Sequence, residues 1–281
     1  MINQRWIRGL ALLVSLLGTV AAAQENSAPA GSASAASPHT IRAAKLIIDD
    51  LKSTQAFYEQ MLRMKEVSHY SAAGVYDEPI MGFGSGARLA LFKPLAEAPI
   101  KKPQAPQVLI YTSDFEATVT RIEAAKHPIR RLPASQSASF KIAISRDPSD
   151  NAVEILERAA APIEVGGSKL IVDNRQKAEE FFTKAFNVKP IQRYQTAGYD
   201  EVLLGFGNGP WLALFEPKTE KPLPKSQFPL VAIYTTDFDG VLARIKDLGY
   251  GYRELKTSSA ERRIIIAKDP AGNAIEVIRQ Q

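Results

Sequence analysis

The chain contains two copies of one sequence pattern, and this internal repeat constrains the fold more than any other feature. Residues 82–94, GFGSGARLALFKP, match residues 205–217, GFGNGPWLALFEP. Near the end of each copy, residues 147–154, DPSDNAVE, match residues 269–276, DPAGNAIE. The two copies follow each other along the chain, so the repeat predicts two homologous domains in tandem. Their expected bounds are residues 40–158 and 162–281.

Each copy contains a smaller repeat of its own. An apolar segment that ends in aspartate, followed by apolar residues at helical spacing, occurs with the aspartates at Asp49, Asp114, Asp173 and Asp237. Aspartate is favoured at helix N-caps because its carboxylate accepts free N–H groups of the first turn, so these residues are the predicted caps. Short strands separated by turns follow each helix. The pattern predicts an α+β fold in which a strand, a helix and three strands form a unit that occurs four times.

The first 39 residues have a different composition. Two arginines, Arg5 and Arg8, precede an apolar run at residues 10–20, and three alanines follow it. This order is typical of a secretory signal peptide, predicted here over residues 1–23, and the run is shorter than the roughly 20 apolar residues of a membrane anchor. The small and polar residues 24–39 predict a flexible linker. We therefore expect a periplasmic or secreted protein without a stable membrane anchor after cleavage.

The net charge and the absence of cysteine limit the kinds of partner and compartment that are expected. Loss of Arg5 and Arg8 with the signal peptide would lower the formal net charge from +5 to +3. The basic residues that remain are dispersed, so a nucleic-acid partner is not expected. The chain has no cysteine, which suits an oxidising compartment and means that no disulfide supports the fold.

The doubled unit that closes in Asp-Pro-x-x-Asn-x-x-Glu resembles the vicinal oxygen chelate superfamily, which includes glyoxalase I, extradiol dioxygenases, and fosfomycin and bleomycin resistance proteins. The resemblance covers nearly all of residues 40–281. It implies two tandem glyoxalase-like domains, each a pair of βαβββ units that form a curved mixed sheet, or cup, with a divalent metal at its base. It also implies that the domains pack as a pseudo-dimer within the chain, and a homodimer is possible.

The resemblance also indicates where metal ligands would lie. These positions are Ala43, Gln107 and Glu154 in the first copy, and Gly167, Leu230 and Glu276 in the second. A divalent ion needs several nitrogen or oxygen donors, and alanine, glycine and leucine side chains have none. No cofactor is therefore expected. Gln107, Glu154 and Glu276 remain weak candidate ligands, and a divalent metal remains the alternative.

Both copies place a lysine and a tyrosine near these positions. Residues two apart on a strand face the same side, so Lys45 and Lys169 should face the cups, as should Tyr111 and Tyr234. We hypothesise that Lys45 pairs with Glu154 and that Lys169 pairs with Glu276, each ammonium replacing the charge of the metal, because a buried glutamate needs a cationic partner. Three roles stay open for these groups: a structural ion pair, orientation of an anionic or carbonyl-bearing ligand, or a lysine that acts as base or nucleophile. No catalytic residue is assigned.

We consider four other features of the sequence as candidate site residues, and two of them have two interpretations. Trp211, where the first copy has Arg88, indicates either an aromatic cup lining or ordinary packing. The repeated Tyr-Asp-Glu at residues 76–78 and 199–201 indicates either the rim of a cup or a solvated turn. The glycines at 82, 84 and 86 predict a hairpin turn, because a strand rather than a helix follows them. The three histidines, which have no counterparts in the other copy, are predicted to be surface residues.

Two functional classes follow. The first is an exported protein that binds a small molecule in one or both cups without the usual metal site. The second is a metal-dependent lyase or dioxygenase with atypical ligands, so whether the chain is an enzyme stays open. The missing ligands favour binding, although a fold by itself does not determine function.

Overall fold

The computed structural model describes residues 37–95, 102, 105–133, 140–159, 162–207, 209–219, 223–257 and 261–280. The predicted signal peptide, and all of the predicted linker except its last three residues, lie outside this range. Within the part of the chain that is described, every helix is too short or too polar to span a bilayer.

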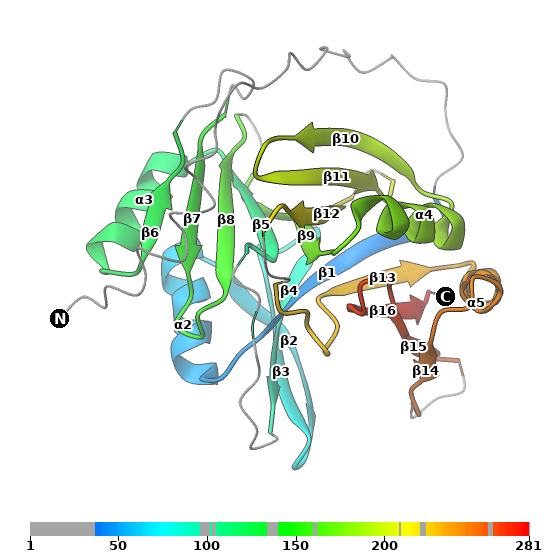
Figure 1. The fold of residues 1–281 in the computed structure, drawn as a ribbon. Helices are drawn as coiled ribbons and strands as arrows, with labels where there is room; N and C mark the ends of the chain where they lie inside the picture. The colour runs from blue at the N-terminus through cyan, green and yellow to red at the C-terminus, as the bar shows by residue number, and fades with distance from the viewer. Residues whose placement is uncertain are drawn as a thin grey trace.

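The described chain consists of four strand-helix-three-strand units, as the sequence predicts (Figure 1). In the first domain the elements are β1 (His39–Ile47), α2 (Leu51–Leu62), β2 (Lys65–Ala72), β3 (Tyr76–Gly82) and β4 (Arg88–Pro94), then β5 (Val108–Thr112), α3 (Phe115–Ala124), β6 (Ile129–Arg131), β7 (Ile142–Arg146) and β8 (Ala152–Glu157). In the second domain they are β9 (Glu164–Ile171), α4 (Arg175–Phe186), β10 (Lys189–Gln195), β11 (Tyr199–Gly205) and β12 (Trp211–Pro217), then β13 (Val231–Thr235), α5 (Phe238–Asp247), β14 (Tyr252–Glu254), β15 (Ile264–Lys268) and β16 (Ala274–Arg279).

The strands form two eight-stranded mixed sheets, and each sheet takes one unit from each domain. Sheet A has the order β14-β15-β16-β13-β1-β4-β3-β2, and sheet B has the order β10-β11-β12-β9-β5-β8-β7-β6. The α+β class and the tandem domains are confirmed. The expectation that the two units of one domain share a sheet is wrong, because β1 pairs with β13 and β5 pairs with β9. The four units have similar first strands, and sequence similarity does not reveal which two of them pair.

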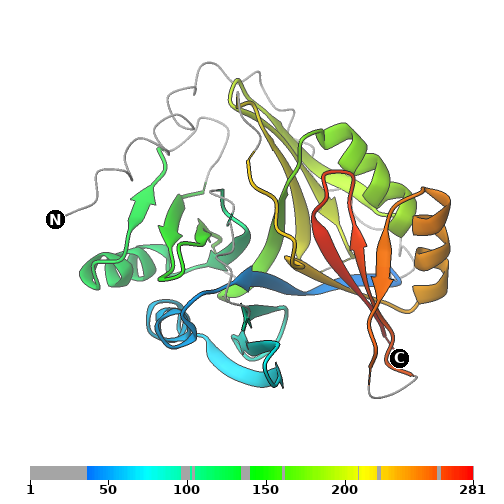
Figure 2. The same ribbon diagram turned by 60° about the horizontal axis from the view of Figure 1, so that its bottom comes forward.

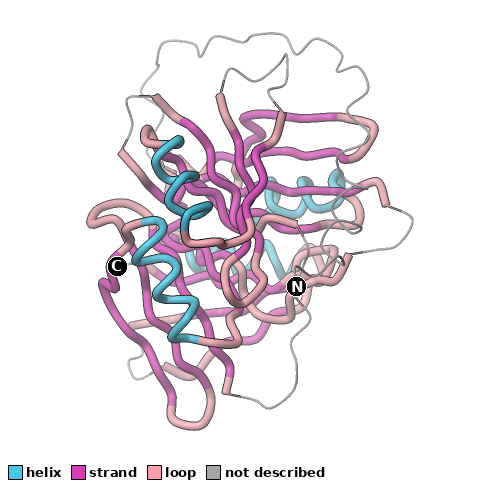
Figure 3. The backbone as a smooth tube through the Cα atoms, turned by 90° about the vertical axis from the view of Figure 1, so that its left-hand side faces the viewer, coloured by secondary structure: helices cyan, strands magenta, loops and turns pink. Residues whose placement is uncertain are grey.

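Although the two units of a domain lie in different sheets, their helices contact each other. Helices α4 and α5 lie beside each other in Figure 2, and α2 and α3 lie beside each other in Figure 3. Their apolar sides pack with alternate strand residues into one large core cluster per domain. On β12, for example, Leu212 and Leu214 enter the core, so Trp211, Ala213 and Phe215 face the opposite side of the sheet. We call the sides of the two sheets that lie opposite the helices the A face and the B face.

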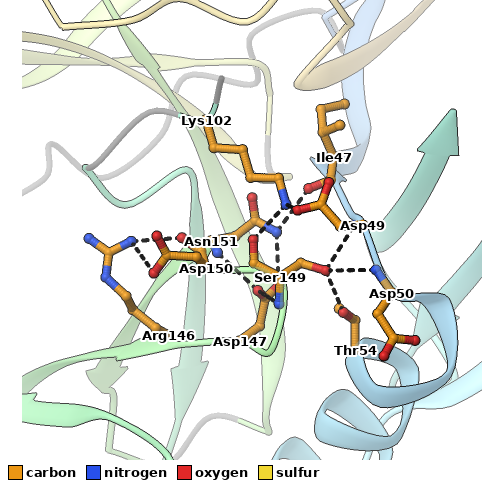
Figure 4. Close-up of polar contacts among 10 residues, drawn as sticks. All are labelled: Ile47, Asp49, Asp50, Thr54, Lys102, Arg146, Asp147, Ser149, Asp150 and Asn151. Carbon is orange, nitrogen blue, oxygen red and sulfur yellow. Dashed lines mark hydrogen bonds and ion pairs between the residues drawn. The ribbon is translucent and has the colours of Figure 1, made fainter. Parts of the chain in front are cut away.

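The closing motif of each domain ties its two units together, and Figure 4 shows the motif of the first domain. Asp147 Oδ1 accepts N–H bonds from Ser149 and Asn151, which shapes the turn before β8. Asn151 Nδ2 then donates to the carbonyl of Ile47 at the end of β1, 3.0 Å away. In the second domain Asn273 makes the same bond to Ile171, at 2.9 Å. Because β8 belongs to sheet B and β1 to sheet A, the motif holds the two sheets against each other.

Two of the predicted helix caps are displaced by one residue. The side chains that cap α2 and α4 are those of Asp50 and Asn174, which accept from backbone N–H groups three residues on. Asp49 and Asp173, the predicted caps, instead pair with Lys102 and Lys225 from the segments between units. Lys102 and Lys225 thus contact the chain just after the first strand of their own domain.

The caps of α3 and α5 lie where the sequence predicts them. Asp114 and Asp237 occupy the N-cap positions, although neither side chain accepts a hydrogen bond from the first turn. Asp237 pairs instead with Arg244 of the same helix.

The glycine-rich segments are hairpin connections, as predicted. Gly84 and Gly86 both have positive φ angles, and the strands on either side, β3 and β4, are antiparallel. One histidine prediction is wrong: His39 is buried, with Nδ1 2.8 Å from Thr235 Oγ1 on β13. The ring is covered because β1 pairs with β13, which the sequence did not reveal.

Candidate functional site

A buried lysine lies between two glutamates on the A face. Lys45 is on β1, with Glu78 two strands away on β3 and Glu276 two strands away on the other side, on β16. Lys45 Nζ donates to Glu276 Oε2 at 2.9 Å and forms an ion pair with Glu78 Oε1 at 2.8 Å. The three side chains are at most 13% exposed, so the charges interact with little screening by water.

The B face has the same arrangement. Lys169 Nζ on β9 donates to Glu154 Oε2 at 3.0 Å and pairs with Glu201 Oε1 at 2.8 Å. The lysine also lies over the ring of Phe215, 5.2 Å from its centroid. The repeat therefore places one lysine and two glutamates at equivalent positions in both sheets.

The pairing of each lysine with a terminal-strand glutamate is confirmed, but the predicted partners are exchanged. Lys45 pairs with Glu276 rather than Glu154, and Lys169 pairs with Glu154 rather than Glu276. The cause is the sheet composition described above. Each cluster thus depends on residues from both domains, and neither domain could complete a cluster alone.

Burial and the neighbouring charges shift the pKa values of these groups. Burial alone would lower the pKa of Lys169, but Glu154 and Glu201 raise it above its ordinary value. The pKa of Lys45 is raised in the same way by Glu276 and Glu78. Burial raises the pKa of Glu201 and of Glu78, and the nearby lysine only partly offsets that effect. Both ammonium groups are therefore protonated at neutral pH and cannot act as bases without disruption of their ion pairs.

The strand neighbours of the terminal-strand glutamates have side chains without donor atoms. On the A face, Ala232 lies opposite both Ala43 and Glu276 in the strand register. On the B face, Leu109 lies opposite both Gly167 and Glu154. The register therefore places Ala232 and Leu109, rather than the predicted Leu230 and Gln107, directly beside the glutamates.

Leu230 and Gln107 lie elsewhere. Leu230 packs in the core cluster of the second domain. The Gln107 side chain is buried, and its Nε2 has no hydrogen-bond partner among the described residues. Gln107 lies one residue before β5 and Leu230 lies one residue before β13, although both were predicted to lie within these strands.

Aromatic side chains line the B face beside its charged cluster. Trp211 Nε1 donates to the Tyr111 hydroxyl at 2.9 Å, which joins β12 to β5. Gly166 permits this contact, because a Cβ atom there would lie 2.3 Å from the Tyr111 ring. Tyr194 faces Glu201 across the β10–β11 pair. Trp211 and Tyr111 thus lie together on the B face, which fits both the lining and the packing interpretation of Trp211.

The A face has arginines where the B face has glycine and tryptophan. Arg42 takes the place of Gly166, and its guanidinium lies 5.1 Å from the centroid of the Tyr234 ring. Arg88 takes the place of Trp211. Arg262 precedes β15 by two residues, and its guanidinium lies 5.5 Å from the centroid of the Tyr70 ring on β2. The two faces therefore share a charged cluster and differ in what surrounds it.

Sequence reasoning included Glu78 and Glu201 only in the Tyr-Asp-Glu motif and did not predict that they pair with the lysines. Of the two interpretations of the Tyr-Asp-Glu motif, the solvated turn is wrong, because both glutamates are buried within strands. Their recurrence in both copies was a usable signal. The alternation of β3 and β11 would have placed them on the same face as the lysine.

Comparison with known proteins agrees with this architecture. The sequence profile of the Glyoxalase/Bleomycin resistance protein/Dioxygenase superfamily matches residues 38–155 and 164–277. This chain belongs to that superfamily. No curated protein sequence matches the chain.

The superfamily fold is also found in solved structures. Glyoxalase I from Zea mays superimposes with a TM-score of 0.71 at 20% identity, covering 86% of this chain and 92% of that one. A putative dioxygenase from Bacillus subtilis subsp. subtilis str. 168 gives a TM-score of 0.66 at 13% identity, covering 88% of this chain and 86% of that one. At these identities the similarity concerns the fold alone.

The divalent metal that the superfamily implies does not fit the donors of either face. In the described residues no three His, Cys, Asp or Glu side chains are grouped so that they could hold an ion. Each terminal-strand glutamate already pairs through one oxygen with a lysine, and the adjoining strands offer only alanine, glycine or leucine, which have no donor atoms for a metal. The donor chemistry therefore disagrees with the usual metal site of the superfamily.

Proposed function

We propose that this chain is an exported protein that binds a small molecule on the A face, the B face or both, without the usual metal. The observation that carries the proposal is the position of the lysines. In each sheet an ammonium group lies between two buried carboxylates, beside residues that cannot coordinate a metal. The charge that a metal would supply is thus supplied by the protein.

The surroundings of the two clusters suit ligand binding. On each face, partly exposed aromatic or basic side chains lie next to buried charged groups, a combination that offers both apolar contact and orientation by hydrogen bonds. Export rests on the sequence of residues 1–23, which is typical of a signal peptide.

A fragment screen on chelator-treated protein tests this function. We expect fragments that bind in the absence of metal, and we expect Trp211→Ala to abolish binding on the B face and Arg88→Ala to abolish binding on the A face. Folding of both variants would be checked by thermal melting. Fragments that bind only after a divalent metal is added would contradict the proposal and favour a metal-dependent lyase or dioxygenase.

A further inference from the structure

The glutamates of the B face keep hydrogen-bond acceptors that the protein does not use. Lys169 Nζ pairs with Oε2 of Glu154 and with Oε1 of Glu201. Among the described residues, none donates a hydrogen bond to the second oxygen of either carboxylate, and Glu201 Oε1 is itself buried with an ion pair but no hydrogen bond. Both residues are only 8% exposed, so these oxygens are acceptors within a largely desolvated site. A ligand with donor groups would satisfy them.

The charge of the cluster determines which donors fit. With both carboxylates ionised, Lys169, Glu154 and Glu201 together carry one excess negative charge. Arg158, whose guanidinium lies 4.4 Å from the centroid of the Tyr111 ring, pairs with Glu164, so this pair adds no net charge. An anionic ligand would meet two carboxylates and one ammonium group that is already shared between them. A cationic ligand would neutralise the excess, and its N–H groups would bind the two unused oxygens.

The aromatic side chains of the B face suit the same ligand. Tyr194 faces Glu201 directly across the strand pair, and Trp211 with Tyr111 lies on the neighbouring strands. Aromatic faces attract cations, most strongly when water is excluded, and they also pack against an apolar ligand body. Acidic and aromatic groups therefore favour the same kind of molecule.

The A face provides the contrast. Around its cluster are Arg42, Arg88 and Arg262, and none of these has an acidic partner among the described residues. Their positive charges would repel a cation. The selectivity for a cation therefore belongs to the B face, where glycine and tryptophan replace two of these arginines.

From these observations we propose that the B face binds an organic cation, with an ammonium or guanidinium group on Glu154 and Glu201 and an aromatic or apolar body against Trp211. The inference rests on the proposed function, since it names the ligand class for one of the two faces. It excludes an anionic ligand there, which was one of the roles that the sequence left open.

Three probes of similar shape test the ligand class: phenethylammonium, phenethyl alcohol and hydrocinnamate, measured by calorimetry on the purified chain. We expect the cation to bind most tightly and the anion most weakly. Glu201→Gln removes the excess charge with little change of shape, and it should weaken binding of the cation by about ten- to a hundredfold, the worth of a hydrogen bond to a charged group. Binding of the neutral alcohol should change much less.

A swap taken from the chain itself provides the matched control. Trp211→Arg gives the B face the residue of the A face and should also weaken binding of the cation, whereas Arg88→Trp on the A face should leave it unchanged. These surface-facing changes keep the inference testable if Glu201→Gln fails to fold.

The outcomes separate the two proposals. Tighter binding of hydrocinnamate, an unchanged preference in Glu201→Gln and Trp211→Arg, or no binding of any probe would each overturn the cation inference. The proposed function would fail as well only if the fragment screen found no metal-independent ligand.

Discussion

Replacement of Lys169 by methionine tests the energetic basis of the charged clusters. The substitution keeps most of the side-chain volume and removes the ammonium group, which leaves Glu154 and Glu201 buried without their cation. At 2.8 Å and an effective dielectric constant of about 20, each ion pair has an attraction of about 6 kcal/mol before desolvation is subtracted. Removal of one partner from a buried pair costs about 3–5 kcal/mol, so we expect the free energy of unfolding at pH 7 to fall by that amount.

The effect should depend on pH in a defined direction. Burial raises the pKa of Glu201 above its ordinary value of 4.5, and loss of Lys169 would raise it further. A carboxyl group with a raised folded-state pKa contributes stability that is present below its unfolded pKa and is lost as the pH rises through the folded value. The deficit of Lys169→Met relative to the parent should therefore be small near pH 4.5 and should grow toward pH 7.

Urea unfolding across this pH range measures both quantities. Lys184→Met, which removes an exposed lysine paired with Glu180, should cost less than about 1 kcal/mol. The triple variant with Glu154→Gln and Glu201→Gln should recover much of the lost stability. A deficit in Lys169→Met below about 1 kcal/mol at pH 7, or one that does not change with pH, would refute the reasoning.

Three further predictions concern the packing and the processing of the chain. Asn151→Ala leaves a buried carbonyl without its donor and should lower the free energy of unfolding by about 1–3 kcal/mol, as measured by urea unfolding; a neutral result would mean that the closing motif does not hold the sheets together. Gly166→Ala should displace the Tyr111 ring and alter tryptophan fluorescence, whereas Gly251→Ala, with open space around its Cβ, should not; equal spectra for the two variants would contradict the packing described. Sequencing of the protein recovered from the periplasm or medium should begin at Gln24, and an intact N-terminus would exclude cleavage at that point.

The sequence predicted the local structure of this fold well. The repeat located the four units, and the alternation of strand residues placed Lys45 and Lys169 with a terminal-strand glutamate on one face. These properties depend on neighbours along the chain, so periodicity and turn residues encode them.

The partner of each unit could not be predicted in the same way. Pairing of β1 with β13 is a contact between residues about 190 positions apart, and β9 would offer a similar edge. For the same reason the predicted glutamate partners of the two lysines were exchanged, and His39 was predicted to be at the surface although it is buried. The error in the predicted metal-ligand positions has a different cause. Strands β5 and β13 begin one residue after Gln107 and Leu230. Periodicity defines strand boundaries less well than it defines the presence of a strand.

The central claim is that a lysine ammonium takes the place of the superfamily metal in each sheet. Elemental analysis of the purified chain, after equilibration with zinc, nickel and manganese and removal of unbound ions, tests it most directly. We expect far less than one equivalent of metal per sheet, with no change in Glu154→Gln or Glu276→Gln. About one equivalent per sheet, lost in these variants, would contradict the claim.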